Sequence, residues 1–192
     1  FRKAGLKFKL SKSIFARSHI KWLGFILSAD GVSVDPDKIK VVANYKKPRN
    51  ATEIRQFLGL TGYNRKAIPS YAAIAKPLTQ LTRKNATFIW GQEQENAFIM
   101  LKQKLINAPV MGLPDYNAPY ILRVDASHQS LSAILSQEQQ GVERVIYYAA
   151  RNLRANEINW HSYELEAAAV AFAFTKFNSF LQFNFTTVYT DC

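Results

Sequence analysis

The spacing of apolar residues changes twice along the chain, and each change predicts a different kind of structure. Near the N-terminus the apolar run 20–27 and the alternating residues 32–34 flank a turn-forming stretch, which predicts a β-hairpin. Between residues 35 and 106, apolar side chains recur at intervals of three and four, as in amphipathic helices. After residue 119 short apolar runs return, and we expect a sheet there.

Capping residues divide the middle region into four predicted helices. Asp35 can cap the first, Pro36 suits its first turn, and this helix should end near Tyr45, before Pro48. Asn50 and Glu53 have the spacing of a capping box for the second helix. The third is predicted to begin at Pro69, with Pro77 as a kink, and the fourth to run over 93–106.

A segment rich in proline, 109–119, predicts a linker before the final module. The pattern beyond it predicts three strands, one long helix and a returning strand, at 120–125, 131–137, 143–149, about 161–181 and 185–190. Three antiparallel strands followed by a helix and another strand make a mixed α/β sheet. The predicted fold class is therefore α+β: a β-hairpin and a helical bundle, followed by a sheet module.

The two halves of the chain differ in net charge. The net charge is +11, but residues 1–110 contain 20 Lys/Arg and 6 Asp/Glu, whereas residues 111–192 contain 5 and 8. A basic module of this kind favours a polyanionic partner, most often nucleic acid, over a merely solvated surface.

The remaining composition excludes several classes of protein. No apolar run approaches the ~18–20 residues of a membrane span. The single Cys192 excludes an internal disulfide and a cysteine-based zinc site, and suits a reducing compartment. The start at Phe1 has neither Met nor a signal-peptide hydrophobic region, so we expect the interior of a longer polypeptide.

Three carboxylates in the sheet module are candidates for metal-assisted chemistry. Asp125 and Asp191 each close a predicted strand, and Glu166 lies on the predicted helix between them. Singly, such residues more often cap turns or face solvent. Together, in strand–helix–strand order, they could hold two divalent cations. Glu164 is about 200° away from Glu166 around a helix, so only one of the two can face the sheet.

Almost the whole chain resembles the C-terminal part of the reverse transcriptase of gypsy-type LTR retrotransposons, joined to its ribonuclease H domain. The resemblance rests on a long collinear set of segments: Leu10-Ser11-Lys12-Ser13, Trp22-Leu23-Gly24-Phe25, Ser28-Ala29-Asp30-Gly31, Asp35-Pro36-Asp37-Lys38-Ile39, Glu53-Ile54-Arg55-Gln56-Phe57-Leu58-Gly59-Leu60-Thr61-Gly62-Tyr63, Lys76-Pro77-Leu78-Thr79, Ala97-Phe98, Leu113-Pro114-Asp115 and Asp125-Ala126-Ser127.

The resemblance implies a domain order. Residues 1–34 would end the polymerase palm with its primer-grip hairpin, 35–84 would be the helical thumb, 85–118 a connecting segment, and 119–192 a ribonuclease H-like domain, truncated at its C-terminus. The palm aspartates would lie before Phe1, so this chain alone is not expected to polymerise DNA. Palm and fingers would precede it and integrase would follow, in an intracellular retroelement complex, either a cytoplasmic virus-like particle or in the nucleus.

The same resemblance implies an enzyme that hydrolyses the RNA strand of an RNA–DNA hybrid. Asp125, Glu166 and Asp191 would be catalytic and would bind two Mg²⁺ ions, with Mn²⁺ as a possible substitute. A Glu-x-x-Ala pattern selects Glu166 over Glu164. A template–primer or hybrid duplex would be held, mostly through phosphates, by residues of the hairpin and thumb: Lys21, Trp22, Gly24, Arg55, Gln56, Gly59, Tyr63, Arg65 and Lys66.

Some positions depart from the family pattern. The family usually has glycine at Ser130 and Ser132, Ser or Thr at Tyr163, and His at Cys192. Residues 64–67 also differ from the common Tyr-Arg-Arg-Phe. With the chain ending one residue after Asp191, one sheet face would be uncovered, and we expect weak or absent nuclease activity from the isolated chain.

Two other functions stay open from the sequence. The chain could be a catalytically inactive, retroelement-derived module that binds nucleic acid through its basic half. It could also be a helix-turn-helix DNA reader, although the preceding hairpin and the acidic sheet module fit that interpretation poorly.

Overall fold

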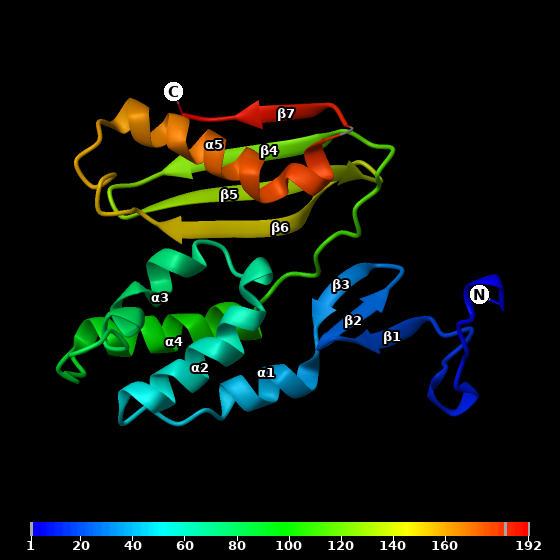
Figure 1. The fold of residues 1–192 in the computed structure, drawn as a ribbon, viewed down its shortest axis with the longest axis horizontal. Coiled ribbons are helices and arrows are strands. Elements are labelled where there is room, and N and C mark those ends of the chain that lie inside the picture. Colours follow the sequence, from blue (N-terminus) through cyan, green and yellow to red (C-terminus); the bar gives the residue numbers. More distant parts are fainter. Residues whose placement is uncertain (1, 183, 192) are drawn as a thin grey trace.

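A computed structural model describes residues 2–182 and 184–191 of the chain. It contains a small three-stranded sheet, a group of helices, and a four-stranded sheet with one long helix across its face (Figure 1). The predicted α+β class is confirmed. Within the described residues, no helix is both long and apolar enough to cross a membrane.

The N-terminal sheet has one strand more than the predicted hairpin. Two short 3-10 helices, Arg2–Ala4 and Leu10–Lys12, precede the antiparallel strands β1 (His19–Trp22), β2 (Phe25–Ser28) and β3 (Gly31–Val34). The apolar run 20–27 was wrongly predicted as one strand. It is broken by a tight turn because Leu23 and Gly24 take φ values of 47° and 75°, the left-handed conformation of two-residue hairpin turns.

The helical module begins where the capping residues predict it to begin. It comprises α1 (Pro36–Ala43), α2 (Ala51–Tyr63), the 3-10 helix η3 (Arg65–Ala67), α3 (Tyr71–Gln80) and α4 (Gln92–Ile106). The side chain of Asp35 accepts from the Asp37 amide at 3.0 Å, and that of Asn50 accepts from the Glu53 amide at 2.9 Å. These two bonds satisfy amides that the helix itself leaves unpaired.

The start of α3 differs from the prediction. The helix begins at Tyr71 rather than Pro69, because Ser70 has a left-handed backbone with φ of 52°. Pro77 lies inside the helix.

Buried apolar side chains of the described residues form two clusters. The first joins the small sheet to the helices, and its centre is aromatic, with the Phe57 and Phe98 rings 4.7 Å apart between centroids. The second lies between the large sheet and its helix and includes Tyr120, Leu122 and Phe177. The helices with the small sheet, and the large sheet with its helix, each have an apolar face that is stable only when buried away from water. The described residues therefore form two separate cores.

The C-terminal module has the predicted sequence of elements: β4 (Tyr120–Ala126), β5 (Ser130–Gln139), β6 (Val142–Asn152), α5 (Ser162–Leu181) and β7 (Thr186–Tyr189). The strand order is β6-β5-β4-β7, with β7 parallel to β4 and the other pairs antiparallel. The helix α5 crosses one face of this sheet and carries the chain from β6 on one edge to β7 on the other (Figure 1).

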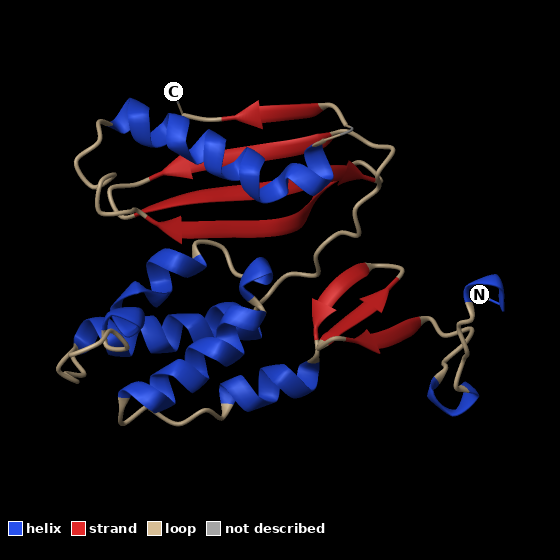
Figure 2. Cartoon of the chain, viewed as in Figure 1, coloured by secondary structure: helices blue, strands red, loops and turns tan. Residues whose placement is uncertain are grey.

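The predicted linker 109–119 is paired to both sheets. Met111 and Val32 exchange two backbone hydrogen bonds of 2.7 and 2.8 Å, and the Gly112 amide donates to the Val145 carbonyl at 2.8 Å. Arg144 on β6 also donates to the Asp30 carbonyl at 2.7 Å. The large sheet therefore stands with its β6 edge above the helices (Figure 2), held by contacts of β6 with α3 and η3.

Candidate active site and nucleic-acid interface

Strand register brings Asp125 and Asp191 to the same level of the large sheet. In the parallel pair, Leu122 is opposite Val188 and Arg123 is opposite Tyr189. Two residues further along the chain, Asp125 lies near the end of β4 and Asp191 follows the end of β7, and both are exposed. The two aspartates thus occupy the neighbouring ends of two parallel strands.

Glu166 on the first turns of α5 reaches both strand ends. One carboxylate oxygen, Oε1, accepts from the amide of Ala126 at 3.3 Å, and the other, Oε2, accepts from the hydroxyl of Thr190 at 3.1 Å. These partners are the residue after Asp125 and the residue before Asp191. The partly buried carboxylate of Glu166 therefore lies between the two backbone segments that carry Asp125 and Asp191.

Glu164 has a different position. Its Oε2 accepts from the amide of His161 at 2.8 Å, where it completes a capping box at the start of α5. This bond satisfies one of the amides left unpaired at a helix N-terminus. Its carboxylate is exposed and belongs to the helix start, so Glu166 is the one that faces the sheet.

The segments that carry Asp125, Glu166 and Asp191 lie next to one another, but the three carboxylates, all of which are among the described residues, are not grouped as metal ligands. Val124 is buried with the residues that contact α5, so alternation along the strand sends Asp125 to the opposite, exposed face. There Ser132 Oγ lies 3.4 Å from Asp125 Oδ2 and donates to it. In residues 2–182 and 184–191, no three His, Cys, Asp or Glu side chains are grouped so that they could hold a metal ion.

The exposed sheet face carries a polar network that sequence reasoning missed. Arg123 donates two hydrogen bonds to Glu143, at 3.2 and 2.8 Å, and Ser136 donates to the same carboxylate at 2.7 Å. The Arg123 guanidinium, helped by Ser136, holds the pKa of Glu143 below its usual value. Arg123 also lies 4.6 Å from the centroid of the Tyr189 ring. No local pattern signals this network, because its members come from four different strands.

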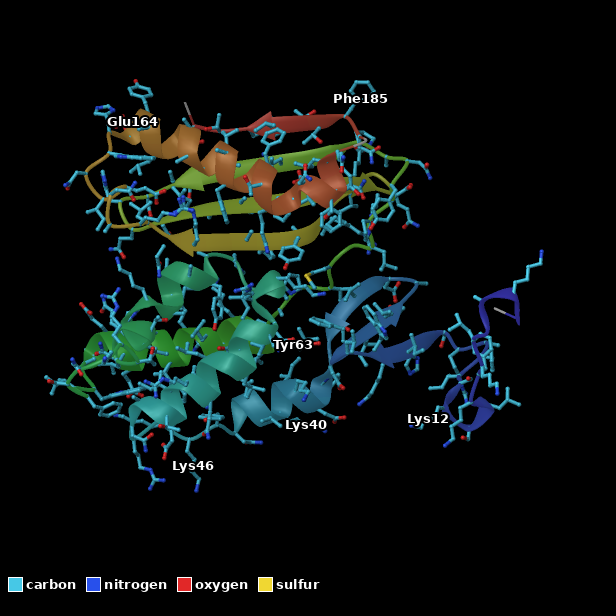
Figure 3. The ribbon with its side chains drawn as sticks, in the orientation of Figure 1. Lys12, Lys40, Lys46, Tyr63, Glu164 and Phe185 are labelled. Carbon is cyan, nitrogen blue, oxygen red and sulfur yellow. The ribbon has the colours of Figure 1, made fainter. Side chains whose placement is uncertain are left out.

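Three of the residues predicted to bind nucleic acid meet in one place. Gly24, Gly59 and Tyr63 line a cavity of about 330 Å³ between the β1–β2 turn and α2. The Tyr63 hydroxyl donates to the Leu23 carbonyl, and its ring stacks on Phe25 with centroids 5.8 Å apart. A Cβ at Gly24 would lie 3.3 Å from the Tyr63 ring. The small sheet and α2 thus form a common surface, on which Tyr63 is exposed (Figure 3).

The cations predicted for this interface are mostly engaged within the protein. Lys21 donates to Asp35 and Asp37, and these bonds, the one to Asp37 first, raise the pKa of Lys21. Lys66 lies 3.9 Å over the Phe25 ring, and burial lowers the pKa of its ammonium. Arg55 donates to the Thr82 carbonyl at 2.9 Å. Lys21, Lys66 and Arg55 therefore make contacts that stabilise the fold, in addition to any contact that they make with a ligand.

The other three predicted residues lie apart from this group. Trp22 is exposed on β1. Gln56 lines a separate cavity of about 840 Å³ together with Lys46, Arg49 and Trp90. Arg65 lines a cavity of about 170 Å³ against β6. The nine residues are therefore spread over several surfaces of the helical module and the small sheet.

Comparison with known proteins places this arrangement in a family. Residues 90–188 match the model of the RNase H-like domain found in reverse transcriptase. The chain is 34% identical over 201 residues to the retrovirus-related Pol polyprotein from transposon opus of Drosophila melanogaster, covering 98% of this chain and 20% of that protein. For the Pol polyprotein from transposon gypsy of the same organism, the identity is 32% over 190 residues, covering 93% and 18%.

Solved structures agree on the fold. Two structures of the foamy viral protease-reverse transcriptase, one with dsDNA and one with an RNA/DNA hybrid, superpose with TM-scores of 0.82 and 0.81 at 22% identity. Each covers 95% of this chain, which corresponds to 38% and 25% of the viral chains. The chain spans about a fifth of the length of the two Drosophila Pol polyproteins. The predicted resemblance is confirmed: the chain belongs to the family of RNase H-like domains found in reverse transcriptases.

Proposed function

We propose that this chain is the part of a retroelement Pol polyprotein that holds a template–primer or RNA–DNA duplex and hydrolyses the RNA strand of the hybrid. The observation that carries the proposal is the pair of hydrogen bonds from Ala126 and Thr190 to Glu166. They bring a helix carboxylate to the ends of the two strands that bear Asp125 and Asp191. Palm and fingers before this segment, integrase after it, and an intracellular retroelement particle complete the proposed context.

The donor set suits a hard divalent cation such as Mg²⁺, because all three side chains are carboxylates on adjacent elements. Bound there, the ion would supply activation of a water nucleophile and stabilisation of the leaving oxygen. Glu166, Asp125 and Asp191 would hold it once the Asp125 side chain turned from the exposed face toward Glu166, whose two hydrogen bonds direct its carboxylate at the strand ends.

Duplex binding is assigned to the surface around Gly24, Gly59 and Tyr63. Gly59 leaves room for a backbone to approach closely, since a Cβ there would meet no atom of the described residues within 4 Å, and Tyr63 offers an exposed ring. The surplus of 14 positive charges over residues 1–110 would attract a duplex through its phosphates, without reading its sequence. The foamy viral relatives were solved with dsDNA and with an RNA/DNA hybrid, which supports this class of ligand.

The test is cleavage of an end-labelled RNA strand in a hybrid with Mg²⁺ under saturating protein. The wild-type chain is compared with Asp125→Asn, Glu166→Gln and the matched control Glu164→Gln, which keeps a capping side chain two residues away. We expect slow cleavage that is lost in the first two variants and kept in the control. Cleavage that persists in Asp125→Asn would refute the assignment of the site.

A second function, nucleic-acid binding without catalysis, is favoured by one observation: the described residues contain no ready group of three metal-binding side chains. It predicts that wild type saturates with hybrid, shows no cleavage with Mg²⁺ or Mn²⁺, and binds as tightly as Asp125→Asn. Both functions predict that the affinity of the chain for nucleic acid falls as the salt concentration rises.

A further inference from the structure

A basic cleft lies between the helical module and the large sheet, apart from the carboxylates and the duplex-binding surface. Its volume is about 330 Å³. One wall comes from α3 and the turn after it, with Lys76, Thr79 and Arg83, and the other comes from the ends of the sheet strands, with His128, Gln129 and Asn152. Because two modules build it, the cleft exists only when α3 is packed beside the large sheet, as it is here.

The charge of the cleft is not neutralised by the protein. No Asp or Glu is among the described residues that line it. Within the described part of the chain, neither Lys76 nor Arg83 forms a salt bridge, whereas Lys21, Lys47, Arg49, Arg123 and Arg151 all do. Two cations that share a concave site without a counter-ion favour an anion between them.

Asn152 adds a polar group without a partner to the same cleft. Its side-chain oxygen, Oδ1, is buried and accepts no hydrogen bond within the described residues. A buried carbonyl oxygen left unpaired is unfavourable, and a ligand hydroxyl that donated to it would remove this cost. The cleft therefore matches a ligand that presents a phosphate and a hydroxyl close together.

The position of the cleft relates it to the candidate active site. His128 and Gln129 belong to the loop that leaves β4, and β4 ends at Ala126, one residue after Asp125. The Gln129 carbonyl accepts from the Leu153 amide at 3.0 Å, which ties this loop to the end of β6 beside Asn152. The loop that lines the cleft therefore begins directly after the strand end that carries Asp125.

We propose that this cleft binds the sugar–phosphate backbone of an RNA strand, with Lys76 and Arg83 on a phosphate and Asn152 on a ribose 2′-hydroxyl. The 2′-hydroxyl is the group by which a protein distinguishes RNA from DNA. The identity of the ligand as an RNA strand rests on the proposed function. The cleft would then hold the RNA between the duplex-binding surface and the carboxylates, and would contribute to the choice of strand.

Fluorescence anisotropy of the whole chain, with a short RNA–DNA hybrid and a DNA duplex of the same sequence, tests this assignment. The cleft variant is Lys76→Gln/Arg83→Gln. The control is Lys40→Gln/Lys46→Gln, which removes the same charge from the side of the helices that faces away from the large sheet (Figure 3). Because the cleft variant can no longer neutralise up to two phosphates, we expect its slope of log affinity against log salt to fall by about 1–2, and that of the control to fall by less.

A third variant, Asn152→Ala, separates hydroxyl recognition from charge. We expect it to reduce the preference for hybrid over DNA duplex by about fivefold or more, the factor that corresponds to losing one hydrogen bond of ~1 kcal/mol, with DNA affinity unchanged. Circular dichroism and thermal melting confirm that each variant is folded.

The outcomes distinguish this inference from the proposed function. Failure of wild type to bind either duplex would sink the proposed function. Binding of wild type with equal losses in the cleft and control variants would overturn the cleft alone. Full retention of the hybrid preference in Asn152→Ala would overturn the assignment of the ribose contact.

Discussion

The carboxylate of Glu166 accepts a 3.3 Å hydrogen bond from the amide of Ala126, 40 residues earlier in the chain. This contact fixes the start of α5 against the end of β4. It also limits the candidate site. Both oxygens of Glu166 accept bonds from the strand ends, which holds its carboxylate between the segments that carry Asp125 and Asp191. Among the described residues, however, these three side chains are not grouped as metal ligands.

Divalent cations should stabilise the chain through this site. At a tenfold excess of Mg²⁺ over its dissociation constant, binding to the folded state alone contributes ~1.4 kcal/mol, or about 4 °C in melting temperature for a chain of this size. Differential scanning fluorimetry with and without Mg²⁺ measures the shift. Asp125→Asn should lose it, and Glu164→Gln should keep it. An equal shift in all three proteins would contradict the assignment.

Gly59→Ala should strengthen the fold and weaken duplex binding. Gly59 lies inside α2, and a Cβ there would meet no atom of the described residues within 4 Å, so alanine should stabilise the helix by about 0.5–1 kcal/mol. If a duplex approaches the helix backbone at this position, the added methyl group lowers its affinity. Urea unfolding and anisotropy measure the two effects. Thr52→Ala, on the same helix, is the control that should raise stability without loss of affinity.

Gly31→Ala should be strongly destabilising. Gly31 has φ of 131°, and a Cβ there would lie 2.1 Å from the Met111 carbonyl oxygen. Alanine must displace Met111 and break its two hydrogen bonds to Val32, at a combined cost of about 3 kcal/mol. Gly141→Ala is the matched control: its φ is 75° but no atom in the described part of the chain lies within 4 Å, so only the ~1 kcal/mol of left-handed strain is expected. Similar unfolding free energies for both variants would disprove the role of Met111.

The ion pair of Arg151 and Glu157 should make stability depend on pH in acid. Glu157 is buried and accepts two hydrogen bonds from Arg151, at 2.6 and 2.8 Å, which lower its pKa from 4.5 to about 2. Since the pKa is lower in the folded state, the stabilisation is complete above pH 4.5 and is lost as pH falls from 4.5 to about 2.

Glu157→Gln checks this dependence. Near neutral pH it leaves Arg151 without its charged partner, and we expect a loss of about 3 kcal/mol in unfolding free energy. Urea titrations between pH 2 and 7 should show the difference between wild type and variant shrinking as the solution is acidified. A difference that is constant over this range would show that the pair contributes nothing through its charge.

Much of the fold follows from local sequence. Asp35 and Asn50 cap the first two long helices at the predicted residues because a side-chain oxygen beside a free amide acts over only two or three residues. The order of strands and helix in the sheet module also follows from apolar periodicity. The split of the run 20–27 was missed because the turn depends on a left-handed Leu23, a conformation that leucine rarely takes.

The sequence by itself determined the family, the basic and acidic halves, and the identity of the three carboxylates as candidates. Tertiary structure alone decided how the two glutamates are engaged, since Glu164 caps a helix start while Glu166 reaches two strand ends. It also decided that Met111 joins two sheets and that Lys76 and Arg83 share a cleft with Asn152. The reason is physical: caps and periodicity act between near neighbours, whereas a site built from distant segments exists only after packing brings them together.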